Sequence, residues 1–162
     1  MRQVQPALWL LCCCAGLVPA LAYGAVSCSV SATGPIFGTY NPLSATPTYS
    51  NGQVHATCTL LSGGATTVTL VSSYSTGASG SYALRSMLSG TNKLGYNLFY
   101  DAAYTEIRGD GTGGSQTGGA SLALTPGSPT QSATSVIYGR IPAGQDVAAG
   151  SYADTIVVTI TY

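Results

Sequence analysis

The chain has 162 residues, about the size of one domain, and only 6% of them are charged, with five basic and five acidic side chains. A typical soluble domain is about 25% charged. Zero formal net charge offers no attraction to phosphate, which argues against nucleic-acid binding. Because Lys93 and Glu106 are the sole lysine and glutamate, a long salt-bridged helix or coiled coil is excluded. Gly, Ser, Thr, Tyr and Val dominate, which is typical of an exported all-β protein.

Residues 1–22 are predicted to be a secretory signal peptide. Arg2 precedes an apolar run over 8–21, which closes on the small-x-small pattern Ala20-Leu-Ala22. Cleavage is expected after Ala22, with cleavage after Gly24 as the alternative. The run is about 14 residues, whereas a membrane span needs about 20. The mature chain, 23–162, is therefore expected to be one domain without a membrane span.

Two cysteines remain after cleavage, Cys28 and Cys58, because Cys12, Cys13 and Cys14 leave with the signal peptide. In an exported protein this pair predicts one disulfide. A zinc site needs about four ligands, and the mature chain adds only His55, so no metal or cofactor is expected. In an alternative interpretation, residues 25–28 resemble a bacterial lipoprotein cleavage box, and lipidation of Cys28 would leave Cys58 unpaired.

The rest of the chain reads as short strands between turn signals. Alternating or β-branched segments predict strands over 28–32, 53–60, 66–71, 93–100, 135–141 and 155–162. Turn signals are Gly34-Pro35, Asn41-Pro42, Asn51-Gly52, 142–144 and 149–150, and 77–80 is a flexible connection. Residues 109–119 hold six glycines and are expected to form a loop or a disordered hairpin tip. Six or seven such strands predict an all-β sandwich.

The last predicted strand is the most apolar one, with Ile156, Val158, Ile160 and Tyr162 on one face. In the sequence nothing follows this strand to cover its edge. An exposed apolar edge invites pairing with another chain. The pattern therefore favours assembly by strand addition.

A series of local motifs, in order along the whole mature chain, resembles the spore coat protein U domain family, which includes subunits of archaic chaperone–usher pili. The motifs are Cys28-Ser-Val30, Phe37-Gly-Thr-Tyr40, Val54-His-Ala-Thr-Cys58-Thr59, Leu84-Arg-Ser-Met87, Leu94-Gly-Tyr-Asn-Leu-Phe-Tyr100-Asp101, Gly109-Asp-Gly111, Tyr138-Gly-Arg-Ile-Pro142 and Ala149-Gly-Ser-Tyr-Ala-Asp-Thr155.

The resemblance implies an incomplete immunoglobulin-like β-sandwich that lacks its last strand. A periplasmic chaperone lends a strand to such a subunit, and at the outer-membrane usher a neighbouring subunit replaces it. The expected strand-acceptor groove has the segment with Ile156, Val158, Ile160 and Tyr162 as one wall. The first strand around Val30, with Phe37, is expected to form the other wall.

The sequence departs from a polymerising subunit before its first strand. A donor segment needs about ten residues to fill a groove. After the expected cleavage only residues 23–27, or 25–27, precede Cys28. We therefore expect a subunit that accepts a strand without donating one, at the distal end of a fibre or outside a fibre.

Catalysis is not expected, because His55 is the only histidine and no Gly-x-Ser-x-Gly motif is present. Asp101, Glu106 and Asp110 are interpreted as turn-capping acids, with a calcium loop as the alternative. Arg85 is expected to pair with a carboxylate.

Arg140 is likewise expected to pair with a carboxylate such as Asp101 or Asp154, and a ligand contact is the alternative for both arginines. Among the eleven tyrosines, a core position is expected for Tyr40, Tyr96, Tyr138 and Tyr152. Tyr74 and Tyr82 are expected at the surface. With the loop around Asp110, they are the candidate adhesive sites for a surface receptor.

The sequence therefore predicts a secreted structural subunit of a chaperone–usher pilus at the cell surface, promoting attachment or biofilm formation. Its expected partners are a periplasmic chaperone, an usher and neighbouring subunits. The alternative is a self-contained spore-coat or matrix protein on the same fold. An enzyme is the remote third hypothesis.

Overall fold

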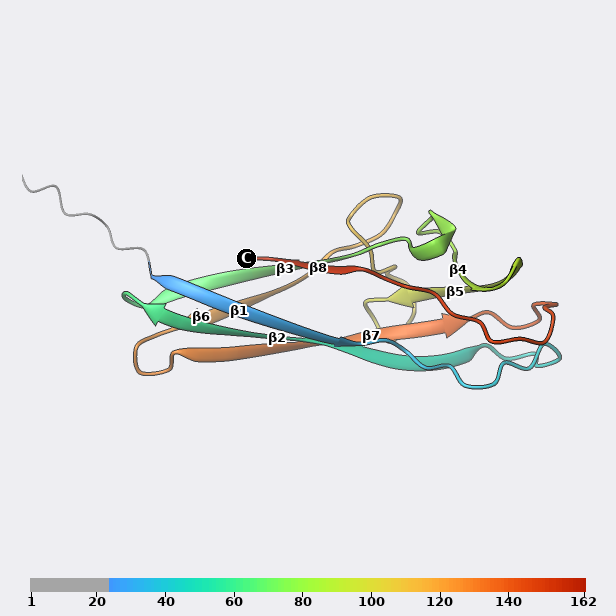
Figure 1. The fold of residues 1–162 in the computed structure, drawn as a ribbon, viewed down its shortest axis with the longest axis horizontal. Coiled ribbons are helices and arrows are strands. Elements are labelled where there is room, and N and C mark those ends of the chain that lie inside the picture. The colour runs from blue at the N-terminus through green and yellow to red at the C-terminus, as the bar shows by residue number, and fades with distance from the viewer. Residues whose placement is uncertain (1–23) are drawn as a thin grey trace, which may run out of the picture.

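The computed structural model describes residues 24–162, which form two β-sheets packed face to face (Figure 1). The expected signal peptide lies outside the described residues. The strands are β1 (Ala25–Thr33), β2 (Thr48–Ser62), β3 (Thr66–Tyr74), β4 (Arg85–Ser89), β5 (Asn92–Phe99), β6 (Gly118–Leu124), β7 (Thr130–Ile141) and β8 (Val158–Thr161), with one 3-10 turn, η1 (Gly77–Ser79). The all-β sandwich expected from the sequence is confirmed.

The larger sheet has the order β1-β2-β7-β5-β4, and the smaller sheet has the order β6-β3-β8. The long antiparallel pair of β2 and β7, in register from Thr48 opposite Ile141 to Thr59 opposite Thr130, forms the spine of the larger sheet. β1 and β8 are each paired on one side only, with β2 and β3 respectively. Each sheet therefore leaves one of these two strands with a free edge.

The alternation of β2 explains how the sheets pack. Val54, Ala56, Cys58 and Leu60 are buried, while the residues between them face the other side. The apolar side chains gather in two clusters along the sandwich. One cluster holds Val54, Tyr74, Met87, Leu94, Tyr96, Leu98, Ile137 and Ile141, and the other holds Ala56, Cys58, Leu60, Val68, Leu70, Leu122 and Leu124.

The turn predicted at Asn51-Gly52 is wrong, because both residues lie inside β2. A Cβ on Gly52 would meet the main-chain atoms of Thr33, Gly34 and Pro35. Glycine is used here because another segment crosses closely over the strand, not because the chain turns.

Other elements differ from the sequence prediction in extent. The strands β4 and β6 were not predicted from alternation, and β6 begins at Gly118, inside the glycine-rich segment expected to be a loop. The remainder of that segment is a loop. The last strand covers only 158–161, because residues 150–157 run as an extended segment with few ladder bonds.

Candidate functional site

An apolar groove of about 1020 Å³ opens at one end of the sandwich. Its floor consists of Leu94, Tyr96 and Leu98 from β5 together with Ile137 and Ile141 from β7, all members of the first core cluster. The groove therefore reaches side chains of the core, each of which is at most 4% exposed.

One wall of the groove is the segment 34–42 that follows β1. Phe37 packs edge-on against Tyr96, with ring centroids 6.0 Å apart. The hydroxyl of Tyr40 donates to the carbonyl of Pro142 at 3.1 Å and accepts from the backbone N–H of Gln145 at 2.8 Å. These contacts tie the wall to the floor and to the loop after β7.

The opposite wall is the segment 147–158, which includes Ile156 and Val158. It is fixed by Asp154, which accepts a hydrogen bond from the hydroxyl of Tyr96 at 2.7 Å and one from the N–H of Ala78 at 2.9 Å. Burial, and secondly the hydrogen bond to Asp154, raise the pKa of Tyr96 well above its ordinary value. The tyrosine therefore stays neutral and keeps donating across the groove.

Three of the six residues expected in the groove line it, namely Phe37, Ile156 and Val158. The other three lie outside this lining. Ile160 packs against both core clusters, Tyr162 is 60% exposed, and Val30 is 46% exposed. The difference arises because β1 ends at Thr33, so it contributes only Ala32 to the lining, and the segment after the strand forms most of the wall on that side.

Val30 still carries information about the free edge. It lies on the same face of β1 as Cys28, whose side chain packs against the second core cluster. An inward-facing valine in a sandwich is normally covered. Its exposure shows that the uncovered strip continues from the groove along β1.

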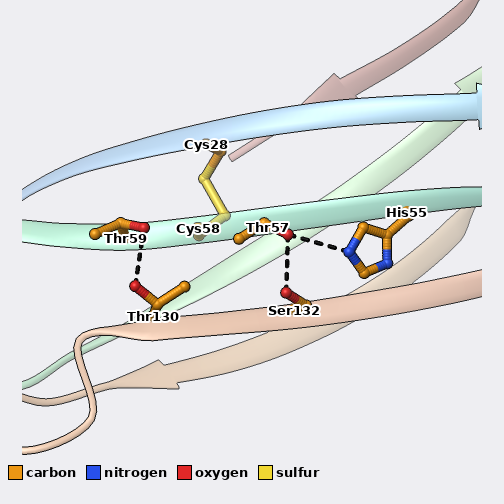
Figure 2. The surroundings of a disulfide bond; sticks show 7 residues. All are labelled: Cys28, His55, Thr57, Cys58, Thr59, Thr130 and Ser132. Atoms are coloured by element: carbon orange, nitrogen blue, oxygen red, sulfur yellow. Dashed lines mark hydrogen bonds between the residues drawn. A yellow bond between two sulfur atoms is a disulfide. The ribbon is translucent and has the colours of Figure 1, made fainter.

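Cys28 and Cys58 form the expected disulfide, which links β1 to β2 at directly opposed positions (Figure 2). The lipoprotein interpretation, which left Cys58 unpaired, is wrong for this structure. Beside the disulfide, His55 lies on the outer face, where Thr57 and Thr134 contact its two ring nitrogens at 3.2 and 2.8 Å. It belongs to a surface hydroxyl network and contacts no acid.

Arg85 is buried, and its hydrogen-bond partners are neutral. It donates to the side chain of Asn97 at 2.7 Å and to the carbonyls of Ser75 and Arg108 at 2.9 and 2.7 Å. The expected pairing with a carboxylate is therefore wrong for Arg85. Burial lowers the pKa of its guanidinium from the ordinary value.

Arg108 is a second buried arginine, which the sequence patterns did not single out. It donates to the Tyr74 hydroxyl at 2.9 Å and to the Val136 carbonyl at 2.7 Å, and it lies 4.6 Å from the ring centre of Tyr100. These bonds connect the loop after β5 with both sheets. The sequence offered one signal for this position: the chain has only five lysine and arginine residues, so each arginine was a candidate for a specific structural role.

Tyr74 and Tyr82 were expected at the surface, and this prediction is wrong, because they are 1% and 8% exposed. The hydroxyl of Tyr82 donates to the carbonyl of Tyr74 at 2.8 Å. Both rings pack against the buried arginines, Tyr82 with Arg85 and Tyr74 with Arg108. Neither tyrosine is a candidate adhesive residue.

Of the four tyrosines expected in the core, Tyr96 is buried, and Tyr40 and Tyr152 pack against the first cluster. Tyr138 differs, since it is half-buried and packs edge-on against Tyr104, outside both clusters. It lies between the buried Ile137 and Ile141 in sequence, and strand alternation turns it to the outer face.

Asp101 and Asp110 act as turn caps, as interpreted from the sequence, whereas among residues 24–162 no group hydrogen-bonds to the carboxylate of Glu106. Asp101 accepts from the backbone N–H groups of Thr105 and Glu106 at 3.0 and 2.8 Å, and these bonds lower its pKa. Asp110 accepts from the N–H of Thr112 at 2.8 Å. Within residues 24–162, no three His, Cys, Asp or Glu side chains gather as metal ligands would.

Residues 24–162 therefore define a β-sandwich with an apolar groove between the segment that follows β1 and the segment that leads into β8. The Spore Coat Protein U domain model matches residues 15–159, and the chain belongs to this family. The chain is 32% identical over 133 residues to Protein U of Myxococcus xanthus, covering 78% of this chain and 70% of that protein.

Among solved structures, the chain is similar to one in the CsuC–CsuE complex of a chaperone and a tip adhesion subunit, from the archaic chaperone–usher Csu pili of Acinetobacter baumannii. The TM-score is 0.49 and the identity is 20%, over 85% of this chain and 40% of the matched chain. No helix in the described part of the protein has the length and apolar character to cross a membrane.

Proposed function

We propose that the chain is an exported structural subunit of a chaperone–usher surface pilus, and that its groove accepts a β-strand from a periplasmic chaperone and then from a neighbouring subunit. The observation that carries the proposal is the apolar groove between the segments 34–42 and 147–158, which adjoin β1 and β8. β1 and β8, which adjoin these two segments, are each paired on one side only, and side chains of the first core cluster form the groove floor. A donated strand would supply main-chain hydrogen bonds and place alternate side chains in the groove.

The geometry favours a long donor. Tyr40 and Val147 are among the residues that line the groove, and Val30 on β1, outside the lining, is 46% exposed. A strand rises about 3.3 Å per residue. A donor of about ten residues would therefore cover both the groove and the strip, with apolar side chains at every second position.

An added donor segment tests this function. Ten residues with alternating apolar side chains would be joined by a flexible linker after Tyr162, and the protein would be exported to a bacterial periplasm. We expect the unmodified chain to need a co-expressed chaperone that co-purifies with it, and the extended chain to be a soluble monomer with a sharp thermal transition.

The matched control is the same segment with its apolar residues shifted by one position. A one-residue shift turns every apolar side chain away from the groove, so this version is expected to remain chaperone-dependent. The proposal fails if the unmodified chain alone is a soluble monomer with cooperative unfolding and the donor segment raises its stability no more than the shifted control does.

A distal place in the fibre, with a role in attachment and biofilm formation, is the finer part of the proposal. It depends on the expected cleavage after Ala22 or Gly24, which leaves too few residues before Cys28 to reach another groove. Mass spectrometry of the mature chain measures this directly. A mature N terminus upstream of Ala20 would remove the reason for a distal place.

The second candidate is a self-contained coat or matrix protein, favoured by the match to the Spore Coat Protein U domain model. Chaperone dependence separates the two candidates. In both, the role is structural and not catalytic.

A further inference from the structure

Four polar aromatic or cationic side chains meet on the outer face of the larger sheet. They are Tyr49 of β2, Tyr104 of the loop after β5, and Tyr138 and Arg140 of β7, and we call them the Tyr–Arg patch. The Tyr104 ring centre lies 4.7 Å from that of Tyr49 and 6.2 Å from that of Tyr138. Tyr49 is 50% exposed, so the patch is accessible.

The patch is built with a strained backbone. Tyr104 has φ of 58°, and it is the only residue other than glycine with positive φ in 24–162. Such a conformation costs about 1–3 kcal/mol and concentrates at functional sites. The carboxylate of Asp101 holds the loop by accepting hydrogen bonds from the N–H groups of Thr105 and Glu106. The Tyr104 ring is therefore fixed in position before any ligand binds.

Arg140 is the cation of the patch, and its donors are not used by the protein. Its guanidinium stacks on Phe99 at 4.8 Å and lies 5.8 Å from the ring centre of Tyr104. No acceptor among residues 24–162 hydrogen-bonds to it, whereas Arg85 and Arg108 are both bonded to carbonyls. The expected pairing with Asp101 or Asp154 is therefore absent. A partly buried guanidinium whose donors have no acceptor in this part of the chain can bind the carboxylate of a ligand with two parallel hydrogen bonds.

A strand in the groove would leave the patch open. Ile137 and Ile141 point into the groove, while Tyr138 and Arg140 alternate with them and point to the opposite face of β7. The patch and the groove can therefore be occupied at the same time.

The outer face continues from the patch as rows of short hydroxyl side chains. Along β1, β2 and β7 the rows are Ser27–Thr59–Thr130, Ser29–Thr57–Ser132 and Ser31–His55–Thr134. No charged residue stands in these rows. The face combines stacked aromatic rings, one unpaired cation and many hydroxyl groups, which suits an extended, hydroxylated and weakly acidic polymer.

We propose that the Tyr–Arg patch binds a carboxylate-bearing polysaccharide, a polyuronate, with the tyrosine rings against the sugar faces and the Arg140 fork on a uronic carboxylate. The rigid tyrosines contribute contact area at low entropic cost. The hydroxyl rows extend the surface for further sugar units.

Isothermal titration calorimetry with tetragalacturonate tests the proposal, using the full chain in whichever form above is soluble. Cellotetraose is the neutral control ligand. Arg140→Met is the test variant, and Lys93→Met is the matched control, because Lys93 is an exposed cation four residues along β5 from Asn97, the residue opposite Arg140, and is not part of the patch. A lost charge-assisted bond predicts affinity lower by about tenfold or more for Arg140→Met, and Lys93→Met is expected to bind like the parent.

Tyr104→Gly separates binding from folding, because glycine accepts the positive φ without strain. Relief of the strained backbone only partly offsets the lost ring contacts with Tyr49, Phe99 and Tyr138, so the variant is expected to unfold cooperatively at a lower melting temperature while losing most of the affinity. Absence of saturable binding, equal affinity for cellotetraose, or equal loss in Lys93→Met would overturn the proposal. A patch variant that changes the sedimentation coefficient but not sugar binding would overturn it too, in favour of an interface between copies. These results do not depend on whether the groove needs a donated strand.

Discussion

Replacing Gly52 by alanine tests whether the groove wall depends on a close crossing over β2. Gly52 is buried, and a Cβ there would lie 2.9 Å from the carbonyl carbon of Gly34, 2.9 Å from the nitrogen of Pro35, and in contact with the Thr33 carbonyl oxygen. All three are main-chain atoms. No rotamer change relieves the clash, so the start of the wall segment must move away from the sheet.

The expected loss follows from two opposing effects. Overpacking a well-filled site costs about 1–3 kcal/mol, and replacing glycine in a strand interior returns about 0.5–1 kcal/mol. Because the clash is with main-chain atoms, the overpacking cost lies in the upper half of that range, about 2–3 kcal/mol, and the net loss in unfolding free energy is then about 1–2.5 kcal/mol. With a urea slope of about 2 kcal/mol per M, the midpoint should fall by about 0.5–1.25 M.

Urea unfolding of the donor-extended chain, followed by circular dichroism, measures this change. Gly64→Ala is the matched control, because a Cβ at Gly64 meets nothing within 4 Å. Its midpoint should match that of the parent. If Gly52→Ala also unfolds at the parent's midpoint, the wall segment does not lie where the structure has it, and the reasoning about the groove fails with it.

Three further predictions concern the stability of the sandwich. Replacing Cys28 and Cys58 together by alanine opens a link across a separation of 30 residues, and the chain-entropy model predicts a loss of about 3.5 kcal/mol; an unchanged melting temperature would contradict it. Arg85→Met leaves buried acceptors on Ser75 and Asn97 unsatisfied and should cost about 3 kcal/mol or more by urea midpoint; a loss below about 1 kcal/mol would show that these acceptors relax. The raised pKa of Tyr96 means that its contribution is fully present below the unfolded value of about 10 and is lost as pH rises above it. Melting temperatures measured from pH 8 to 11.5 should therefore fall at the alkaline end, less steeply in Tyr96→Phe, and equal slopes would refute the assignment.

The strand content was predictable where a strand has one buried and one exposed face. The regular alternation of β2 and β7 is visible in the sequence, and so is the apolar face with Ile156 and Val158. The family motifs and the pairing of Cys28 with Cys58 were also visible. Local sequence patterns could not predict where one main-chain segment passes close to another. Asn51-Gly52 has the composition of a turn, but it lies within β2, where the segment 33–35 crosses closely over Gly52.

The buried polar positions were the other source of error. A tyrosine beside glycines looks exposed, but Tyr74 and Tyr82 have buried arginines and carbonyls as partners. Those partners come from segments far away in the chain, such as Arg108 for Tyr74, so no window of sequence contains the reason for burial. The Tyr–Arg patch was invisible for the same reason, because its rings come together only through sheet register and one strained loop.

The hydroxyl rows beside the disulfide, with Thr57 bonded to Ser132 and Thr59 bonded to Thr130 (Figure 2), have a consequence for colloidal behaviour. These rows carry no charged side chain and so gain no protection from electrostatic repulsion, and apart from Arg140 in the neighbouring Tyr–Arg patch there is little on this face for dissolved salt to screen. The resistance of these hydroxyl rows to self-association depends on water bound by the hydroxyl groups. The dispersal of this protein, alone or in a fibre, should therefore vary little with ionic strength and respond instead to solutes that compete for hydration.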